Sequence, residues 1–419
     1  MNMEKSSGKF IPNLVVVMTI VAYFRLFGFK AIPYPIQVLS QPLMCSVMLT
    51  MIIIKVIYFR ETVVKMHFST PVLLLIFSTI PSLFIAYYYH NQTFLGSIWA
   101  SNAILFYVLY FYLHYFKISP RFLLKVIVYI GVIVVGFYYV QYVMYPTKVF
   151  NAHMFEDRGT IRMFIPGMLC TQLAYFYFLN RFFKNTSYLN LLLALVCLSI
   201  FILQGTRQFI FAFALLTLIN MAFYRKMRSK FLIMITVTAG LVLVFVLFKE
   251  IFAELTQVSS SQSSNLSEGI RIKAARFYLT SFMPDGLAYI FGNNQPALGG
   301  PYSQKMVMYT LKYGFYLSDI GLIGDYVTYG IVFVLAGLVL VFKGIFFKVR
   351  DQYKFLKYYI VFQSMTLIAG RGIFSGVDIL ILSIVYIFDQ DRAHVLLEHF
   401  DKQEQVETEN TSEKELLTI

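Results

Sequence analysis

Arginine residues occur in this chain at positions where a cation is costly, because long apolar segments flank them. Arg207 lies in LQGTRQFIFAF, and Arg158 and Arg162 lie in EDRGTIRMFIPGM. Arg271 and Arg276 belong to a third polar segment, SEGIRIKAARFYLTSF. A guanidinium is planar, permanently charged and forms paired hydrogen bonds with phosphate oxygens. Arginines that converge beside a membrane therefore indicate a phosphate-bearing headgroup as ligand.

Helical spacing limits which arginines can act together. Arg271 and Arg276 are separated by roughly 140° around a helix, so they cannot both face one phosphate, and Arg271 is the stronger candidate. Lys273 and Arg276 share a face and are equally well explained as solvated side chains. Arg371, in GRGIFSG, is a further candidate for the set.

A simpler interpretation of Arg207 is an interfacial anchor whose long side chain reaches water. Several arginines on one side of the membrane make that explanation weaker. Placing a cation near the bilayer midplane costs roughly 2.5 to 3.5 kcal/mol on insertion scales. A shared anion-binding site is therefore the favoured interpretation.

The elements that must position these side chains are membrane-spanning helices. Of 419 residues, 58% are hydrophobic and 13% are charged, with a mean hydropathy of +0.68. The apolar runs are continuous rather than alternating, which predicts an all-α, polytopic integral membrane protein of about 12 transmembrane helices. The expected spans are 10–29, 36–58, 70–89, 94–116, 122–145, 163–180, 188–204, 208–224, 231–252, 318–342, 355–370 and 372–388.

Lysine and arginine in alternate short loops predict the orientation, because such loops face the cytoplasm. Both termini are then cytoplasmic, and the arginines described above face outward. The tail holds nine acidic and three basic residues and is expected to be disordered. The predicted chain has four parts. Spans one to nine occupy 1–252, and one long periplasmic or extracellular loop occupies 253–317, in which 258–269 is a flexible connector. Spans ten to twelve occupy 318–388, and the acidic cytoplasmic tail occupies 389–419.

Other kinds of site are weakly indicated. Cys45, Cys170 and Cys197 all lie in apolar runs, which argues against a disulfide framework or a zinc site. The D-x-D sequence from Asp389 to Asp391 resembles the metal motif of nucleotide-sugar transferases, but it follows the last expected span and is more simply the start of the acidic tail. We therefore expect neither a metal nor a cofactor.

Several short motifs, taken in order, resemble the O-antigen polymerase and ligase superfamily, and most closely its Wzy-type polysaccharide polymerases. They are GTRQ between two spans, EDRGTIRMFIPG before a span, IRIKAARFYL followed by LAYIFGNNQP in the long loop, and YLSDIGLIGDYVTYGIVFV entering the next span. The resemblance covers about residues 145–388.

The resemblance implies a C-type glycosyltransferase fold in the bacterial inner membrane, with the active site on the periplasmic or outer face. Family members transfer a growing glycan from undecaprenyl pyrophosphate to a non-reducing-end hydroxyl of a second lipid-linked repeat unit. Arg158, Arg162, Arg207, Arg271 and Arg276 would bind the pyrophosphates and stabilise the leaving group without a metal. The implied partners are the lipid-linked glycan, the bilayer, and chain-length and export proteins, with no nucleic acid.

Asp319 and Tyr316 complete the expected site. Asp319, in YLSDIGLIGD, occupies a position at which the superfamily often has an acidic residue, where it would orient or deprotonate the acceptor hydroxyl. It is equally well explained as the N-cap of the next helix. Tyr316, together with Tyr302, Tyr309 and Tyr313, would stack on sugars or anchor the loop at the interface.

Two alternatives stay open. The ligase branch has a histidine near the end of the long loop, whereas no histidine lies between His153 and His394 here, which disfavours a ligase. A flippase or secondary transporter would also be polytopic, but such proteins commonly show internal repeats and helices broken near the midplane. No clear repeat is found in this sequence.

Overall fold

The computed structural model describes residues 9–59, 66–157, 160–223, 235, 238–239, 269–367 and 379–393. Within this part of the chain, four helices are long and apolar enough to cross a membrane: α3 (Tyr34–Phe59), α4 (Ser69–His90), α7 (Pro120–Met144) and α16 (Leu322–Phe346). A fifth span would be bent by 59° and consists of α5 (Phe94–Ala100), η2 (Asn102–Tyr107) and α6 (Val108–Tyr115). A helical membrane protein is thereby supported, and the count of twelve spans stays a prediction.

The remaining helices of the bundle are shorter. They are α2 (Phe10–Tyr23), α8 (Met168–Asn185), α9 (Tyr188–Leu203), α10 (Arg207–Phe223), α17 (Lys354–Leu367) and a last helix over 379–393, with short turns η1 (Arg25–Gly28) and η5 (Asp351–Tyr353). Most expected spans coincide with a helix. The span expected over 231–252 lies outside the described residues apart from three positions. The last helix continues to residue 393, past the tail boundary placed at 389.

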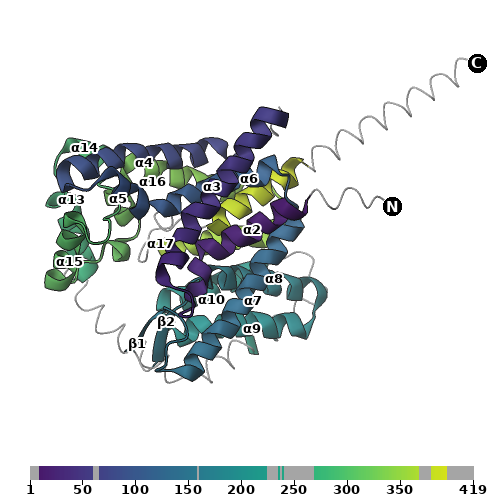
Figure 1. The fold of residues 1–419 in the computed structure, drawn as a ribbon. Coiled ribbons are helices and arrows are strands. Elements are labelled where there is room, and N and C mark those ends of the chain that lie inside the picture. The colour runs from purple at the N-terminus through teal and green to yellow at the C-terminus, as the bar shows by residue number, and fades with distance from the viewer. Residues whose placement is uncertain are drawn as a thin grey trace, which may run out of the picture.

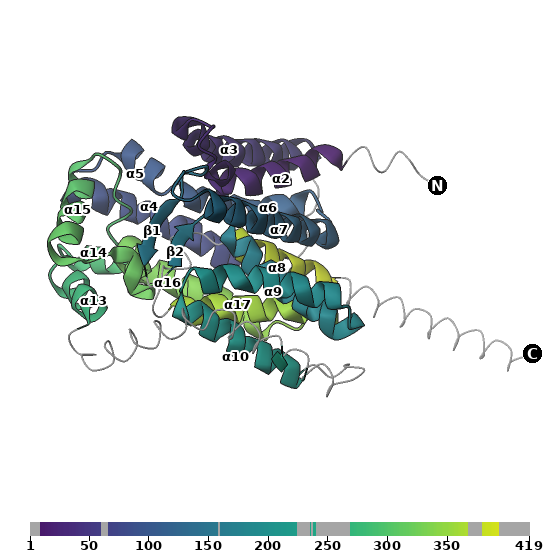
Figure 2. The same ribbon diagram turned by 90° about the horizontal axis from the view of Figure 1, so that it is seen from below.

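One large apolar core holds the bundle together, with α7 and α9 against α8 and with α10 and α16 against α17. Figures 1 and 2 show the two termini leaving the bundle at one end, while the hairpin and helices α13 to α15 lie at the opposite end. The orientation of these two ends relative to a membrane stays a prediction.

A β-hairpin precedes α8 and is the exception to an all-helical fold. Strands β1 (His153–Asp157) and β2 (Thr160–Phe164) pair antiparallel. The expected start of the sixth span at 163 is therefore wrong, and α8 begins at Met168. The reason is local, because Pro166 has no backbone N–H and Gly167 has a left-handed φ of +100°.

The long loop forms a packed unit, here called the loop lobe (residues 269–320). Its elements are α13 (Ile270–Thr280), α14 (Gly286–Phe291), α15 (Pro301–Tyr313) and η4 (Leu317–Ile320). Tyr278, Phe282 and Tyr302 form a second core with Ile85 of α4 and Val327 of α16. Each large apolar side chain buried there contributes about 1.5 to 3 kcal/mol, so the lobe is anchored on two membrane helices. The connector predicted over 258–269 lies outside the described residues apart from Gly269.

Two glycines allow a close backbone contact between the lobe and the bundle. Gly292 (φ +74°) and Gly330 (φ +83°) have backbone angles that favour glycine. A Cβ on Gly330 would overlap the carbonyl oxygen of Ile290, and a Cβ on Gly292 would overlap the backbone of Thr328. Gly330 interrupts the helical geometry of α16, so the break in this span is occupied by backbone from the loop lobe.

Candidate functional site

The hairpin fixes Arg162 against two aromatic rings. Arg162 lies opposite Phe155 in the strand register, and Phe164 follows on the same face of β2 because side chains alternate along a strand. The guanidinium carbon lies 5.4 Å from the centre of the Phe155 ring and 5.9 Å from that of Phe164. Cation–π contacts of this kind stabilise the charge and limit the orientations of the side chain.

Reciprocal hydrogen bonds join this hairpin to the turn between α9 and α10. The Arg162 Nε donates to the Gln204 carbonyl oxygen at 2.9 Å, and the Gln204 side-chain amide donates to the Met163 carbonyl oxygen at 2.6 Å. Gln204 is buried, so both bonds are shielded from water. These bonds hold together two segments that are roughly forty residues apart in the sequence, at the end of the bundle opposite the termini.

The turn itself places Arg207 at the first position of α10. Gly205 has a φ of +62°, and the Thr206 carbonyl oxygen accepts from Phe209 N at 3.0 Å as α10 begins. Of the Arg207 residue only the backbone is described. In the described part of the chain the buried Thr206 hydroxyl has no hydrogen-bond partner. Arg207 and this hydroxyl thus belong to the turn whose Gln204 contacts Arg162, whereas Arg158 and Arg371 lie outside the described residues.

Arg271 and Arg276 lie on α13, in the loop lobe. Both are exposed, while Ala274 and Tyr278 form the buried face of the same helix. Burial raises the pKa of Tyr278 to about 12, so its hydroxyl stays protonated and donates to the Phe315 carbonyl oxygen at 3.1 Å. Across the described residues no hydrogen bond or ion pair joins Arg271 or Arg276 to the hairpin. No described contact therefore links Arg271 or Arg276 to Arg162, and the convergence of the arginines on one ligand stays a prediction.

Asp319 is exposed at the edge of the lobe, on η4, which packs against α13. The interpretation of Asp319 as a helix N-cap is wrong. Gly321, with a φ of +56°, is the N-cap of α16, and the one hydrogen bond that the Asp319 side chain accepts from the described residues comes from the Ser318 hydroxyl at 3.3 Å. Tyr316 is also exposed, with 52% of its surface accessible. Both groups are therefore accessible to a ligand on the same side as Arg271.

Tyr302 differs from the other tyrosines predicted to stack on sugars, because it is buried. Its ring lies 4.1 Å from that of His90, and its hydroxyl donates to the Asn294 carbonyl oxygen at 3.2 Å. His90 also contacts the Asn293 side-chain oxygen at 2.9 Å. Tyr302 is therefore part of the packing between the lobe and α4 and does not present a face to a glycan.

Residues 293 and 294 were not singled out by the sequence, although they follow Gly292 in the FGNNQP segment. Asn293 N donates to the Val327 carbonyl oxygen at 2.9 Å, and Asn294 N donates to that of Thr328 at 2.6 Å. These carbonyls are available because α16 is broken at Gly330. The signal that could have identified this pair is two adjacent asparagines directly after a glycine, in a segment otherwise expected to be exposed.

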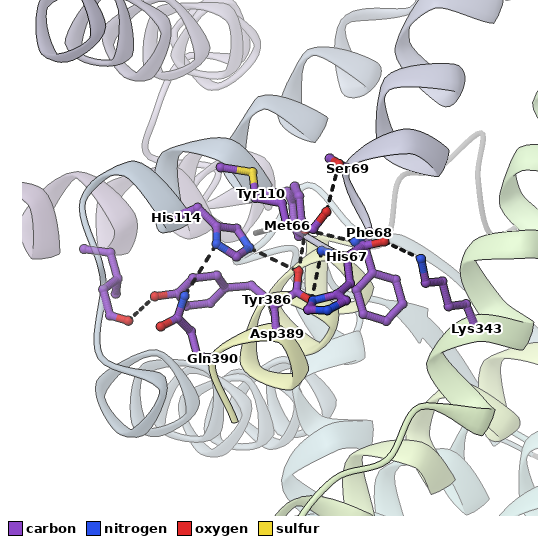
Figure 3. Close-up of polar contacts among 11 residues, drawn as sticks. Met66, His67, Phe68, Ser69, Tyr110, His114, Lys343, Tyr386, Asp389 and Gln390 are labelled. Carbon is purple, nitrogen blue, oxygen red and sulfur yellow. Dashed lines mark hydrogen bonds and ion pairs between the residues drawn. The ribbon is translucent and has the colours of Figure 1, made fainter. Parts of the chain in front are cut away.

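A second polar centre lies at the end of the bundle that carries the termini (Figure 3). Asp389 accepts from the Tyr110 hydroxyl at 2.5 Å, from His67 Nδ1 at 3.0 Å and from the His67 backbone at 3.3 Å. His114 Nε2 lies 3.4 Å away, without hydrogen-bond geometry. Asp391 pairs with Arg350. The interpretation of these aspartates as the start of a solvated tail is therefore wrong, since both are 2% exposed or less.

No protein-family model, curated protein or solved structure matches this chain.

Proposed function

We propose that this chain is a membrane-embedded glycosyltransferase that polymerises lipid-linked oligosaccharide repeat units. It would transfer the growing glycan from undecaprenyl pyrophosphate to the non-reducing-end hydroxyl of a second lipid-linked unit. The observation that carries the proposal is the contact between Arg162 and the turn before Arg207, held at 2.9 Å through the Gln204 carbonyl oxygen. The full proposal includes twelve spans, a C-type glycosyltransferase fold and an active site on the periplasmic face.

The chemistry follows from the position of the charges. Breaking the bond between the anomeric carbon and the pyrophosphate leaves negative charge on the departing oxygen. Arg162 is already oriented by two rings and a carbonyl oxygen, so little reorganisation is needed when that charge develops. Arg207 at the start of α10 and the unpaired Thr206 hydroxyl would add donors from the same turn.

The loop lobe would serve the acceptor. Arg271 would bind the pyrophosphate of the second lipid, and Asp319 would take the proton of the acceptor hydroxyl. Both are exposed, and their elements α13 and η4 pack together. Holding two lipid-linked substrates by their headgroups makes the reaction between them effectively local, which supplies much of the rate enhancement.

A secondary transporter is the second candidate, because α16 is broken at Gly330 and carries the fully buried Asp325 near its start. Broken helices with buried charges mark substrate sites in transporters. The break here is filled by backbone of residues 290–294, which donates to the exposed carbonyls of α16. A filled break favours a structural joint over a transport site.

Reconstitution with lipid-linked repeat units separates the two candidates. Purified protein in vesicles should lengthen the glycan, measured as a ladder on a gel. Movement of substrate between leaflets without longer chains would support the transporter and contradict the polymerase. Arg207→Ala and Arg271→Ala should each abolish chain growth without changing the thermal midpoint. Arg181→Ala, at the opposite end of the bundle, should leave chain growth intact. Normal turnover in Asp319→Asn would remove Asp319 as the base.

A further inference from the structure

An apolar groove runs between α4 and α16 on the outside of the bundle. Its volume is about 380 Å³, and it is lined by Thr70, Pro71, Leu74, Val332, Leu335, Ala336, Val339 and Lys343. Because α4 begins and α16 ends at the same side, the groove leads from the middle of α16 towards the end that carries the termini. Every residue on its wall is apolar or small except the lysine at that end.

Lys343 closes the groove and is held in place by its surroundings. Its ammonium donates to the His67 carbonyl oxygen and lies 5.3 Å from the centre of the Phe68 ring, as Figure 3 shows for the side chain and its partner. An ammonium has three donors, so the contact with one carbonyl leaves others for a ligand. Lys343 itself is exposed.

A pair of aromatic rings connects this lysine with a second cation, Arg392. The Arg392 guanidinium lies 5.3 Å from the centre of the Phe347 ring, and that ring lies 5.0 Å from the ring of Phe68. Among the described residues neither Lys343 nor Arg392 has a carboxylate partner. The nearby Asp389 carboxylate is already engaged, because it accepts hydrogen bonds from His67 and Tyr110.

We propose that this groove binds an anionic phospholipid, with one acyl chain between α4 and α16 and the phosphate at Lys343 and Arg392. The proposal depends on the bundle lying in a membrane and is independent of the polymerase activity. An acyl chain fits an apolar groove that opens on the lipid-facing side of two candidate spans. Two cations at its end favour a headgroup with net negative charge over a zwitterionic one, since each basic side chain near the surface attracts anionic lipid. A soluble phosphate would not use the groove.

Native mass spectrometry of the full-length protein in detergent tests the proposal, with phosphatidylglycerol and phosphatidylcholine of identical acyl chains as probes. The first phosphatidylglycerol should bind more tightly than the first phosphatidylcholine. Lys343→Gln with Arg392→Gln should weaken that first phosphatidylglycerol by roughly 25-fold, or about fivefold for each cation, and should leave phosphatidylcholine unchanged. The charge-retaining pair Lys343→Arg and Arg392→Lys should restore binding.

The matched control removes the same number of charges at the same end of the bundle. Arg181→Gln with Lys184→Gln, in the last two turns of α8, should leave binding of the first phosphatidylglycerol unchanged. Val339→Trp fills the groove while keeping both cations, so it should weaken binding of that lipid even if the double glutamine variant fails to fold. Equal affinity for the two lipids, equal losses in the two double variants, or full binding in Val339→Trp would each overturn the proposal.

Discussion

At the end of the bundle that carries the termini, Asp389 is 2% exposed and its carboxylate accepts from Tyr110 and His67. At the opposite end, Arg162 is half-buried, rests on two rings and donates to the Gln204 carbonyl oxygen. The first centre surrounds a charge with protein donors. The second orients a charge against a turn that also holds the Thr206 hydroxyl, which lacks a partner among the described residues.

The difference indicates which polar centre stabilises the fold and which is available for chemistry. A buried carboxylate is tolerated when its oxygens are satisfied within the protein, and removing it leaves several donors without partners. A guanidinium whose orientation is fixed by its surroundings can instead stabilise charge on a ligand. We therefore expect changes at Asp389 to act on stability and changes at Arg162 to act on activity.

The largest effect is expected from Asp389→Ala. The substitution leaves the Tyr110 hydroxyl and the two His67 donors without an acceptor in a buried site. It should lower the free energy of unfolding by about 3 to 5 kcal/mol. The measurement is the thermal midpoint and the yield of monodisperse protein in detergent.

Asp351→Ala is the matched control, because Asp351 pairs with Lys354 at 2.7 Å while both side chains are more than half exposed. Solvent screens such a pair, and the loss should be at most about 1 kcal/mol. Equal shifts for the two aspartates would show that the Asp389 centre is not a structural element of the bundle.

A smaller loss is expected from Gly330→Ala, which tests whether the end that carries the loop lobe also has a rigid part. The new Cβ would overlap the Ile290 carbonyl oxygen, and the backbone there has a φ of +83°. Strain of this kind costs about 3 kcal/mol. Thermal unfolding followed with the single tryptophan, Trp99, should report the loss.

The control for that change is Gly136→Ala, in α7, where a Cβ would meet nothing within 4 Å. Alanine is the better helix former, so this variant should be as stable as the parent or more stable by up to about 1 kcal/mol. A Gly330→Ala protein with an unchanged midpoint would mean that the lobe is not locked to α16 through this contact.

The smallest effect is expected from Arg162→Lys, which keeps the charge but removes the planar fork. Chain growth in reconstituted vesicles should fall about tenfold, because a lysine does not reproduce bidentate contacts with phosphate. The thermal midpoint should hardly move. Arg181→Lys is the comparison, since Arg181 also stacks on a ring, that of Tyr177 at 5.7 Å, but lies away from the proposed site. Equal activity in both variants would contradict a role for Arg162 in pyrophosphate binding.

The sequence predicts the long helices well, because their signal is local. Continuous apolar runs locate α3, α4, α7 and α16, and Pro120 begins α7 where proline is tolerated at the first helical turn. The alternation of basic loops predicts which segments face outward, and that orientation stays a prediction. The contact between Arg162 and the turn before Arg207 depends on tertiary packing. The sequence predicts this contact only because a shared anion-binding site requires the arginines to converge.

Two features were missed for different reasons. The hairpin has only a weak local signal, because the two residues between HMFED and TIRMF are Arg-Gly rather than the Asn-Gly or Asp-Gly of the commonest tight turns, and the segment was expected to be an outer loop before the sixth span. The burial of Asp389 has no local signal, because its partners His67 and Tyr110 are hundreds of positions away. The acidic composition around it suggested solvent exposure. Only the packing of the last helix against α6 and the start of α4 makes the carboxylate internal.

The distance along the chain between His67 and Asp389, 322 positions, has a consequence for biogenesis. During translation, α4 and α6 enter the bilayer long before the last helix leaves the ribosome, so His67 and Tyr110 wait without their acceptor. The bundle can close only after nearly the whole protein has been synthesised. On the predicted topology, a truncated product would expose unpaired polar groups at its cytoplasmic end. Membrane proteases and insertion chaperones can distinguish such exposed groups from a finished protein.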